Sequence, residues 1–328
     1  MTKLRVGILG SGGIAARHAA AIATLGAKMQ LVACCGRNEH RVAEFAAKFS
    51  ALPYTHFQRM LKEVRLDLLI VALPPYAHSG QVEDAAAAGI HLLVEKPIAL
   101  DMQRAQSMVT AAKQAGIIAA CGFMYRFGDA VLRWDAEAAA GATGRAGLFV
   151  GQFHCNALHA DWWREQAKSG GQVVEQLIHI IDLARHHLGE PQSVYARGSN
   201  YFHGRTDRYD SDDVSAMILG YDDGRVAVLN ATNGAVPGKW EKSWQVIAER
   251  MTGQFTGWNS AVLTHTQGAA KVERIDTQTD VFVAQLTDIA GAISARRAPR
   301  VPLEDGAKTL RIALAAARSS AEKREILL

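Results

Sequence analysis

The chain has 328 residues, of which 49% are hydrophobic and 21% are charged, and its formal net charge is +4. This length predicts about two domains, and the composition is typical of a globular protein. The apolar runs are shorter than the ~20 residues of a membrane-spanning helix, and no basic run of the kind that binds nucleic acid is present. No secretory signal is visible. We therefore expect a cytoplasmic protein without membrane or nucleic-acid partners.

The first 122 residues alternate short apolar strands with helical segments. The expected strands cover residues 4–9, 31–35, 66–73, 91–94 and 117–121, and the expected helices cover 14–25, 41–49, 78–88 and 102–115. Strands without polar alternation that are separated by helices are typical of a parallel sheet covered on both faces. We therefore predict an α/β Rossmann domain over residues 1–122.

The pattern changes after Gly122. Strands are expected over residues 148–153, 193–198, 214–221 and 225–231, and helices over 281–295 and 305–320. Asp222-Asp223-Gly224 joins the last two strands and is a hairpin signal. We therefore expect residues 123–328 to form an α+β domain with a large, mainly antiparallel open sheet that binds the substrate. Because such a sheet usually needs a partner on its outer face, we expect a homodimer or homotetramer.

A glycine-rich turn follows the first expected strand. Gly10 and Gly12 match the first two glycines of the dinucleotide-binding pattern, and Ala15 stands in the permitted third place. Gly10 allows a tight turn, and Gly12 lets the backbone approach a pyrophosphate. The amides that open the next helix, starting at Gly13 and Ile14, then face the anion. The alternative is a merely structural glycine turn.

The end of the second strand bears on the choice of nicotinamide cofactor. NAD-binding domains usually place a carboxylate there to hold the ribose hydroxyls. This chain reads Cys35-Gly36-Arg37-Asn38, and Glu39 comes too late. The guanidinium of Arg37 can pair with a 2′-phosphate, although it can also be an ordinary solvated side chain. The sequence therefore favours NADP, with NAD as the alternative.

A second signal lies in a helix expected to follow Gly170-Gly171 and to end near Leu188. The helix is apolar around most of its circumference, which is typical of a buried helix. Glu175, His179 and Asp182 interrupt it on one face. Buried ionisable groups are costly unless they are paired or face a polar cleft. The pattern indicates either a catalytic site with His179 as general acid or base or a satisfied structural network.

A third signal is Glu95-Lys96-Pro97, directly after the expected strand at 91–94. Ligands bind at the carboxyl ends of strands in open parallel sheets, and Pro97 restricts the turn that carries Lys96. The alternative is a loop with a surface salt bridge.

Together these features resemble the Gfo/Idh/MocA family, named for glucose–fructose oxidoreductase and inositol dehydrogenase, over essentially the whole chain. The matching segments are Gly10–Ala15, Leu73–His78, Ala88–Pro97, Gly122–Phe127 and Gly170–Asp182. The resemblance implies a hydride transfer between nicotinamide and the carbinol or carbonyl carbon of a sugar, polyol or sugar derivative. It implies that Lys96 hydrogen-bonds the reacting oxygen and that His179 exchanges the hydroxyl proton.

The resemblance also implies roles for further residues. Beyond the glycine-rich turn and Arg37, the residues that it implies for cofactor binding are Leu73, Pro74, His78, Glu95 and Lys96. The residues that it implies for substrate binding are Tyr125, Arg126, Trp163, Arg164 and Asp182. Simple packing is the alternative for Trp163. Glu175 is the third expected catalytic residue, although the family often has Asp there and Gly in place of Leu177.

Two rival functions stay open. One is a dinucleotide- or sugar-sensing protein without turnover, and the other is an enzyme that acts on an imine or a tetrapyrrole. No metal site is expected, because a strand would separate His154 from His159. We expect His186 and His187 to point away from one another at the surface. The cysteines lack metal-binding spacing and are expected to be buried thiols.

Overall fold

The computed structural model describes residues 3–157, 160–268 and 271–328. The chain forms two compact units, of which the first comprises Met1–Met124 and Asp280–Ala307 and the second Tyr125–Thr279 and Lys308–Leu328. None of the described helices combines the length and the apolar character that a membrane span requires. The domain boundary expected after Gly122 stays a prediction.

In the described part of the first unit, six strands form a parallel sheet. They are β1 (Leu4–Leu9), β2 (Met29–Cys35), β3 (Leu52–Tyr54), β4 (Leu68–Val71), β5 (His91–Val94) and β6 (Ala119–Cys121). The strand order is β3-β2-β1-β4-β5-β6, and each pairing is parallel. This is the Rossmann order, in which ligands bind where the order reverses, beside β1 and β4. The predicted Rossmann fold is confirmed.

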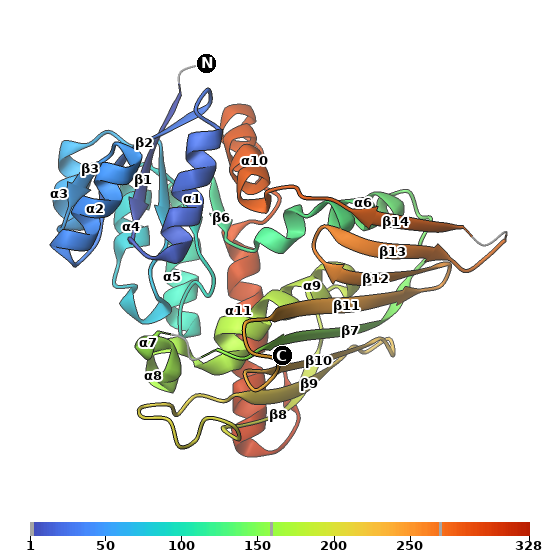
Figure 1. Ribbon diagram of the computed structural model, residues 1–328. Coiled ribbons are helices and arrows are strands. Elements are labelled where there is room, and N and C mark those ends of the chain that lie inside the picture. The colour runs from blue at the N-terminus through green and yellow to red at the C-terminus, as the bar shows by residue number, and fades with distance from the viewer. Residues whose placement is uncertain (1–2, 158–159, 269–270) are drawn as a thin grey trace. The chain divides into compact units, whose positions relative to one another are not determined.

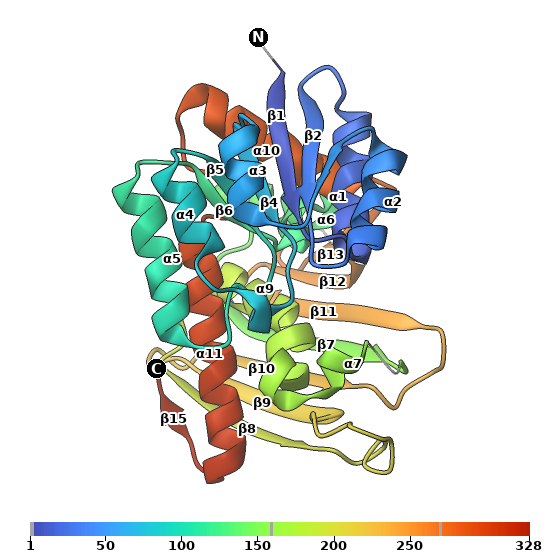
Figure 2. The ribbon, with the colours of Figure 1, turned by 90° about the vertical axis from the view of Figure 1, so that its left-hand side faces the viewer.

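Helices lie on both sides of this sheet (Figure 2). They are α1 (Gly13–Thr24), α2 (Glu39–Phe49), α3 (Phe57–Glu63), the 3-10 turn η1 (Pro75–Ala77), α4 (Gln81–Ala87), α5 (Met102–Gln114) and α10 (Val281–Ala295). Asn38 and Asp101 cap α2 and α5 by accepting hydrogen bonds from the amides of Arg41 and Arg104. Every residue of β4 is fully buried, as a sheet covered on both faces requires.

Two features of this unit differ from the sequence prediction. The sequence missed β3 and α3, because β3 is a short edge strand that contains Pro53 and exposes much of its surface. The helix expected from His78 begins only at Gln81. Gly80, with φ +116°, stands immediately before it and breaks the helical backbone.

The second unit is built on an open mixed sheet, in which the described strands number nine (Figure 1). They are β7 (Ala146–Cys155), β8 (Ser193–Ser199), β9 (Val214–Gly220), β10 (Val226–Thr232), β11 (Trp240–Ala248), β12 (Met251–Gly257), β13 (Ser260–His265), β14 (Val272–Asp276) and β15 (Ile326–Leu327). The order is β14-β13-β12-β11-β7-β10-β9-β8-β15. Only β7 and β10 pair in parallel among these strands. The mainly antiparallel open sheet is confirmed, although β11–β14 and β15 were not predicted.

The helices of this unit range from single turns to the 20-residue helix α11. They are the 3-10 turn η2 (Met124–Phe127), α6 (Asp129–Ala139), α7 (Asp161–Arg164), α8 (Gln166–Ser169), the π-helical turn η3 (Val173–Leu177), α9 (Ile178–Leu188) and α11 (Leu303–Glu322), which begins in the first unit. Helix α9 packs closely on β7, because a Cβ at Gly151 would lie 2.5 Å from Ile180. The predicted buried helix is confirmed, but it opens as a π-helix, a form often found at functional sites.

Candidate active site

The glycine-rich turn has the conformation that a dinucleotide site needs. Gly10 has φ +119°, and a Cβ there would lie 2.4 Å from the carbonyl oxygen of Ala72, so only glycine fits. Gly12 caps α1, and a Cβ at Gly12 or Gly13 would meet no protein atom within 4 Å. Ile14 is 41% exposed. The start of α1 is therefore open to an anion, and these residues fit a dinucleotide pyrophosphate.

The tip of β2 carries the residue that bears on cofactor choice. The exposed Arg37 donates a hydrogen bond from Nη2 to the hydroxyl of Tyr76 at 3.3 Å. A Cβ at Gly36 would lie 3.3 Å from the hydroxyl of Ser11, so this tip lies against the glycine-rich turn. Glu39 is the first residue of α2, as expected. A guanidinium and a hydroxyl therefore border this part of the turn.

The segment between β4 and α4 carries three residues expected on the cofactor side. Leu73 and Pro74 follow β4 and are half-buried. His78 is buried, and desolvation lowers its pKa to about 4. The ring of His78 is therefore neutral near pH 7, so it can bind a ligand only as an uncharged donor or acceptor.

The Glu95-Lys96-Pro97 segment follows β5 and is anchored from within the unit. One carboxylate oxygen of Glu95 lies 2.6 Å from Nε2 of His18, and the other accepts a hydrogen bond from the amide of Lys96 at 3.3 Å. Glu95 is only 6% exposed, so its partner is a buried histidine and not a surface cation. The Lys96–Pro97 peptide bond is cis.

Two residues of this anchor were not predicted from the sequence. His18 is fully buried on α1, where it shares a face with Ala15 and Ile22. A lone histidine on that apolar face was the available signal. A Cβ at Gly122 would lie 2.6 Å from the Glu95 carboxylate, so the absence of a side chain there leaves room for the anchor.

In the second unit, His179 belongs to a stack of three rings. It lies on α9, is 6% exposed, and stacks on Tyr125 with ring centroids 4.4 Å apart and planes 15° apart. The ring of Trp258 also stacks on that of Tyr125, with centroids 4.7 Å apart. Burial raises the pKa of Tyr125, so its phenol stays neutral. Trp258, in the turn between β12 and β13, was not predicted.

Two residues expected on the substrate side bind each other. Nε and Nη2 of Arg126 lie 2.7 and 2.5 Å from the two carboxylate oxygens of Asp182, and both side chains are buried. Thr309 donates a further hydrogen bond to Asp182 at 3.2 Å, and Arg185 lies 3.8 Å away. The pair links η2 to α9 directly beside the stacked rings of Tyr125 and His179.

The remaining expected residues lie around η3 and α7. Glu175 is half-buried in the π-helical turn. Trp163 is 4% exposed and meets the ring of Tyr209 edge-on with centroids 6.2 Å apart. Nη1 of Arg164 lies 3.5 Å from Asp161.

The histidine pair near the end of α9 differs from expectation. His186 binds Asp135 of α6 at 2.8 Å, and its ring centroid lies 5.1 Å from that of His187. His187 packs among Trp134, Phe149 and Phe255, and desolvation lowers its pKa to about 3. The expected surface placement is therefore wrong, because α6 and the sheet cover this end of α9.

One cluster of histidine and aspartate side chains near the end of α9 has the spacing of metal ligands. Ligand atoms of Asp135, His186 and His187 lie within 4.8 Å of one another, a spacing that could hold a metal ion. His159 lies outside the described residues, and His154 bonds to Asn230 at 2.6 Å. The four cysteines are buried free thiols, and desolvation raises the pKa of Cys34 and Cys35 to about 11.

A Rossmann unit with an open dinucleotide turn, followed by a unit with an open mixed sheet, defines a class of nicotinamide-dependent oxidoreductases. The family model described as "Oxidoreductase family, NAD-binding Rossmann fold" matches residues 4–123, and the Gfo/Idh/MocA C-terminal domain model matches residues 133–253. Together they span most of the chain, which therefore belongs to the Gfo/Idh/MocA family. The predicted class of enzyme, an NAD(P)-dependent oxidoreductase, is confirmed.

Individual relatives are distant. The chain is 25% identical to myo-inositol 2-dehydrogenase of Thermotoga maritima, over 99% of this chain and 98% of the relative. It is 27% identical to D-xylose 1-dehydrogenase (NADP(+)) 2 of Haloferax volcanii, over 93% and 94%. A solved levoglucosan dehydrogenase in complex with NADH and L-sorbose has the same fold, with a TM-score of 0.92, 20% identity, and coverage of 100% and 99%.

Proposed function

We propose that the protein is a dehydrogenase or reductase that moves a hydride between nicotinamide and the carbinol or carbonyl carbon of a sugar, polyol or sugar derivative. Relatives that align over nearly the whole chain are named for inositol and xylose as substrates, which supports this substrate class. The site residues expected from the sequence keep their roles as part of this proposal.

The chemistry of the reaction defines the roles that we assign to the polar residues. The nicotinamide ring, when bound, accepts the hydride in the oxidation direction. The hydroxyl proton must leave as the C–H bond breaks, so a base is needed at the oxygen. We assign this role to His179, and we assign to the Lys96 ammonium the stabilisation of charge that develops on the same oxygen. Glu175, four residues before His179, is assigned to orient and tune the imidazole.

The residues expected to bind the substrate fall into two groups: direct contacts, and a pair of residues that bind each other. Tyr125, Trp163 and Arg164 are proposed as substrate contacts. Arg126 and Asp182 are bound to each other, and we propose that they act on substrate binding through the positions of Tyr125 and His179. Their sequence neighbours Tyr125 and His179 are the stacked rings, so the ion pair fixes both elements that carry the stack.

The observation that carries the proposal is the buried His179 on α9, whose ring stacks on that of Tyr125. The test is a turnover assay of the purified protein with NAD⁺ and NADP⁺ against polyols, aldoses and sugar acids, followed by nicotinamide absorbance. Reduction of the dinucleotide with one of these carbinols is the expected result. Tight dinucleotide binding without turnover on any carbinol would instead favour the non-catalytic sensor.

We propose NADP as the preferred cofactor, with Arg37 on the 2′-phosphate. The exposure of Arg37, and its position against the glycine-rich turn through Gly36 and Ser11, support this. Fluorescence titration with NADPH and NADH should show tighter NADPH binding, and Arg37→Ala should weaken NADPH alone. Equal or better NADH binding would reject the role of Arg37 and keep the Rossmann site.

We also propose that the open face of the sheet binds a second copy of the chain. A row across this face joins Tyr195, Ile218, Val228 and Val150, which lie opposite one another in register. Val150, Tyr195 and Ile218 are between 37% and 47% exposed, and contiguous exposed apolar surface usually marks an interface. Light scattering should give the mass of a dimer or tetramer, and a monomeric mass would reject the proposal.

A further inference from the structure

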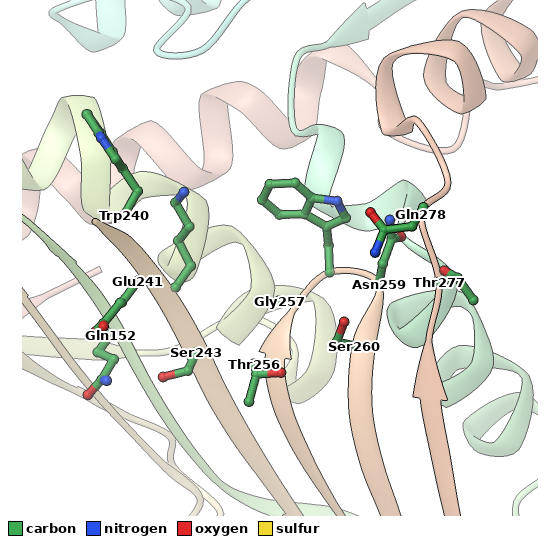
Figure 3. A pocket seen from close by; sticks show the side chains of 12 residues that line it. Gln152, Trp240, Glu241, Ser243, Thr256, Gly257, Asn259, Ser260, Thr277 and Gln278 are labelled. Carbon is green, nitrogen blue, oxygen red and sulfur yellow. The ribbon is translucent and has the colours of Figure 1, made fainter. Parts of the chain in front are cut away.

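A cavity opens in the second unit where two neighbouring strands separate. β11 and β12 pair only between Trp244–Ile247 and Thr252–Phe255. Earlier residues of β11 pair with β7, and the end of β12 pairs with β13. The gap between the strands holds a cavity of about 520 Å³ (Figure 3). This volume lies within the range of small-molecule sites, about 300–1,000 Å³.

The lining of the cavity combines indole rings, neutral polar groups, the carboxylate of Glu241 and the ammonium of Lys242. Trp240 and Trp258 supply the rings, and Gln152, Thr256 and Asn259 supply amides and a hydroxyl. Figure 3 shows Trp240 on β11, Thr256 on β12, Asn259 in the turn after β12, and Gln152 on the neighbouring strand β7. An indole face can pack on the apolar face of a sugar ring, while the amide of Gln152 and the hydroxyl of Thr256 can hydrogen-bond its hydroxyl groups. Asn259 is held by the amide of Asp129 and the carbonyl of Thr279.

Lys242 is the cation of this cavity. Its Nζ lies 5.3 Å from the ring centroid of Phe153, 5.6 Å from that of Trp240 and 5.8 Å from that of Trp258. Desolvation lowers the pKa of Lys242. Among the described residues, no carboxylate forms a salt bridge to this ammonium within 4.0 Å. It interacts with the faces of the three aromatic rings and with the Cys155 thiol.

An ammonium in this setting favours an anionic ligand. Removing a charge from water is costly unless an opposite charge compensates it, and ring quadrupoles compensate only part of it. Glu241, the next residue on the strand, also lines the cavity, but it projects from the opposite face of the sheet to Lys242 and forms no salt bridge with it within 4.0 Å. A carboxylate or phosphate on the ligand would therefore supply the missing counter-charge.

Stacked rings link the wall of the cavity to the candidate proton-transfer residue. Trp258 forms part of the cavity wall and stacks on Tyr125, which in turn stacks on His179. A ligand seated against Trp258 therefore lies two stacked rings from His179, within the same unit.

We propose that this cavity binds the anionic group and ring of an acidic sugar, with Lys242 on a carboxylate or phosphate and Trp258 against the ring face. The acidic sugar is then the substrate class of the proposed dehydrogenase. That last step rests on the proposed function, whereas the binding of the anion does not.

The binding test is titration of tryptophan fluorescence in the full chain, without dinucleotide. The probes are D-glucuronate, α-D-glucose 1-phosphate and D-glucose. We expect at least one anionic probe to bind about tenfold or more tightly than D-glucose, as a charge-assisted hydrogen bond allows. The tighter of the two anions identifies carboxylate or phosphate as the preferred group. Equal affinity for all three probes, or binding of none, would overturn the proposal.

Three variants make the test specific. Lys242→Met keeps the length of the side chain among the aromatic rings and should abolish the preference for the anion, whereas Lys242→Arg should retain most of it. Lys239→Met removes an exposed lysine nearby and is the matched control. An unchanged preference in Lys242→Met, or a loss in Lys239→Met of the same size, would reject Lys242 as the anchor.

His179→Ala separates this proposal from the proposed function. It should keep the binding of the anionic probe and lose turnover. Anion binding that depends on Lys242, without turnover of any sugar acid, would refute the acidic sugar as substrate and keep the cavity as a binding site. Turnover of a sugar acid with the same kcat/KM in Lys242→Met as in the wild type would support the dehydrogenase and reject the subsite.

Discussion

Nε2 of His18 lies 2.6 Å from the carboxylate of Glu95, and both side chains are buried although 77 positions separate them in the chain. The contact joins α1, which begins at the glycine-rich turn, to the end of β5, which carries Lys96. The ring of Phe282 packs edge-on against the ring of His18, with centroids 5.1 Å apart. The helix that follows the glycine-rich turn and the segment that carries Lys96 therefore share one buried polar contact.

The first prediction concerns this contact. His18→Ala leaves the buried carboxylate of Glu95 without its strongest partner, so the free energy of unfolding should fall by about 1–3 kcal/mol. Chemical denaturation measures the change. His40→Ala is the matched control, because His40 pairs with Glu44 while 82% exposed, and its removal should leave the stability unchanged. Equal stability of His18→Ala and wild type would contradict a structural role for the contact.

The glycine-rich turn gives a prediction that separates folding from ligand binding. Gly10→Ala places a methyl group against the carbonyl of Ala72 at a strained φ, so it should destabilise the protein and lower dinucleotide affinity. Gly12→Ala meets no protein atom and should fold normally, yet it should weaken dinucleotide binding. Thermal unfolding and fluorescence titration distinguish the two variants. Normal affinity in Gly12→Ala would place the pyrophosphate elsewhere.

The buried ion pair of Arg126 and Asp182 should be costly to break. Asp182→Asn leaves a buried guanidinium without its counter-charge, and such changes destabilise by about 3–5 kcal/mol. Glu249→Gln, which breaks a solvent-exposed pair with Arg145, should leave stability unchanged. Urea unfolding of both variants compares them directly, and a similar small effect of the two would show that the ion pair with Asp182 contributes little to stability.

Two histidines with lowered pKa values, the buried His78 and the half-buried His187, predict how stability depends on pH. The folded-state pKa values of His78 and His187 are lowered to about 4 and about 3, below the ordinary 6.5. The unfolded chain therefore binds more protons below pH 6.5, so stability falls as pH drops toward 4. Each histidine contributes a slope of up to about 1.4 kcal/mol per pH unit. His187→Phe should reduce this slope in unfolding curves, and an unchanged slope would show that His187 does not contribute.

The parallel sheet and its glycine-rich turn could be predicted because their signals are local. Uninterrupted apolar strands such as Leu68–Val71 lie between helices, and Gly10 follows a strand directly. Strands β11–β14 were not predicted, and β12 shows how packing by a distant segment can hide a strand pattern. In β12 the inward positions are Met251, Gly253 and Phe255, and the glycine interrupts the apolar alternation. The ring of Trp134 fills the space where a side chain at Gly253 would lie.

The candidate site was predicted in part for the same reason. Lys96 and His179 stand in local patterns that a sequence displays. The partner of Glu95 and the stacking of Trp258 on Tyr125 depend on tertiary packing between distant segments. The separation of β11 from β12 likewise arises from strand pairing, so the cavity around Lys242 has no local signature.

The most direct test of the proposed dehydrogenase is steady-state turnover of His179→Ala and Lys96→Ala, with dinucleotide affinity measured on the same samples. Loss of a general base or of charge stabilisation at the oxygen should lower kcat by about 10²–10⁴-fold. Dinucleotide affinity should stay within about threefold of wild type, less than ~1 kcal/mol. Wild-type turnover in either variant would remove that residue from the mechanism and contradict the central claim.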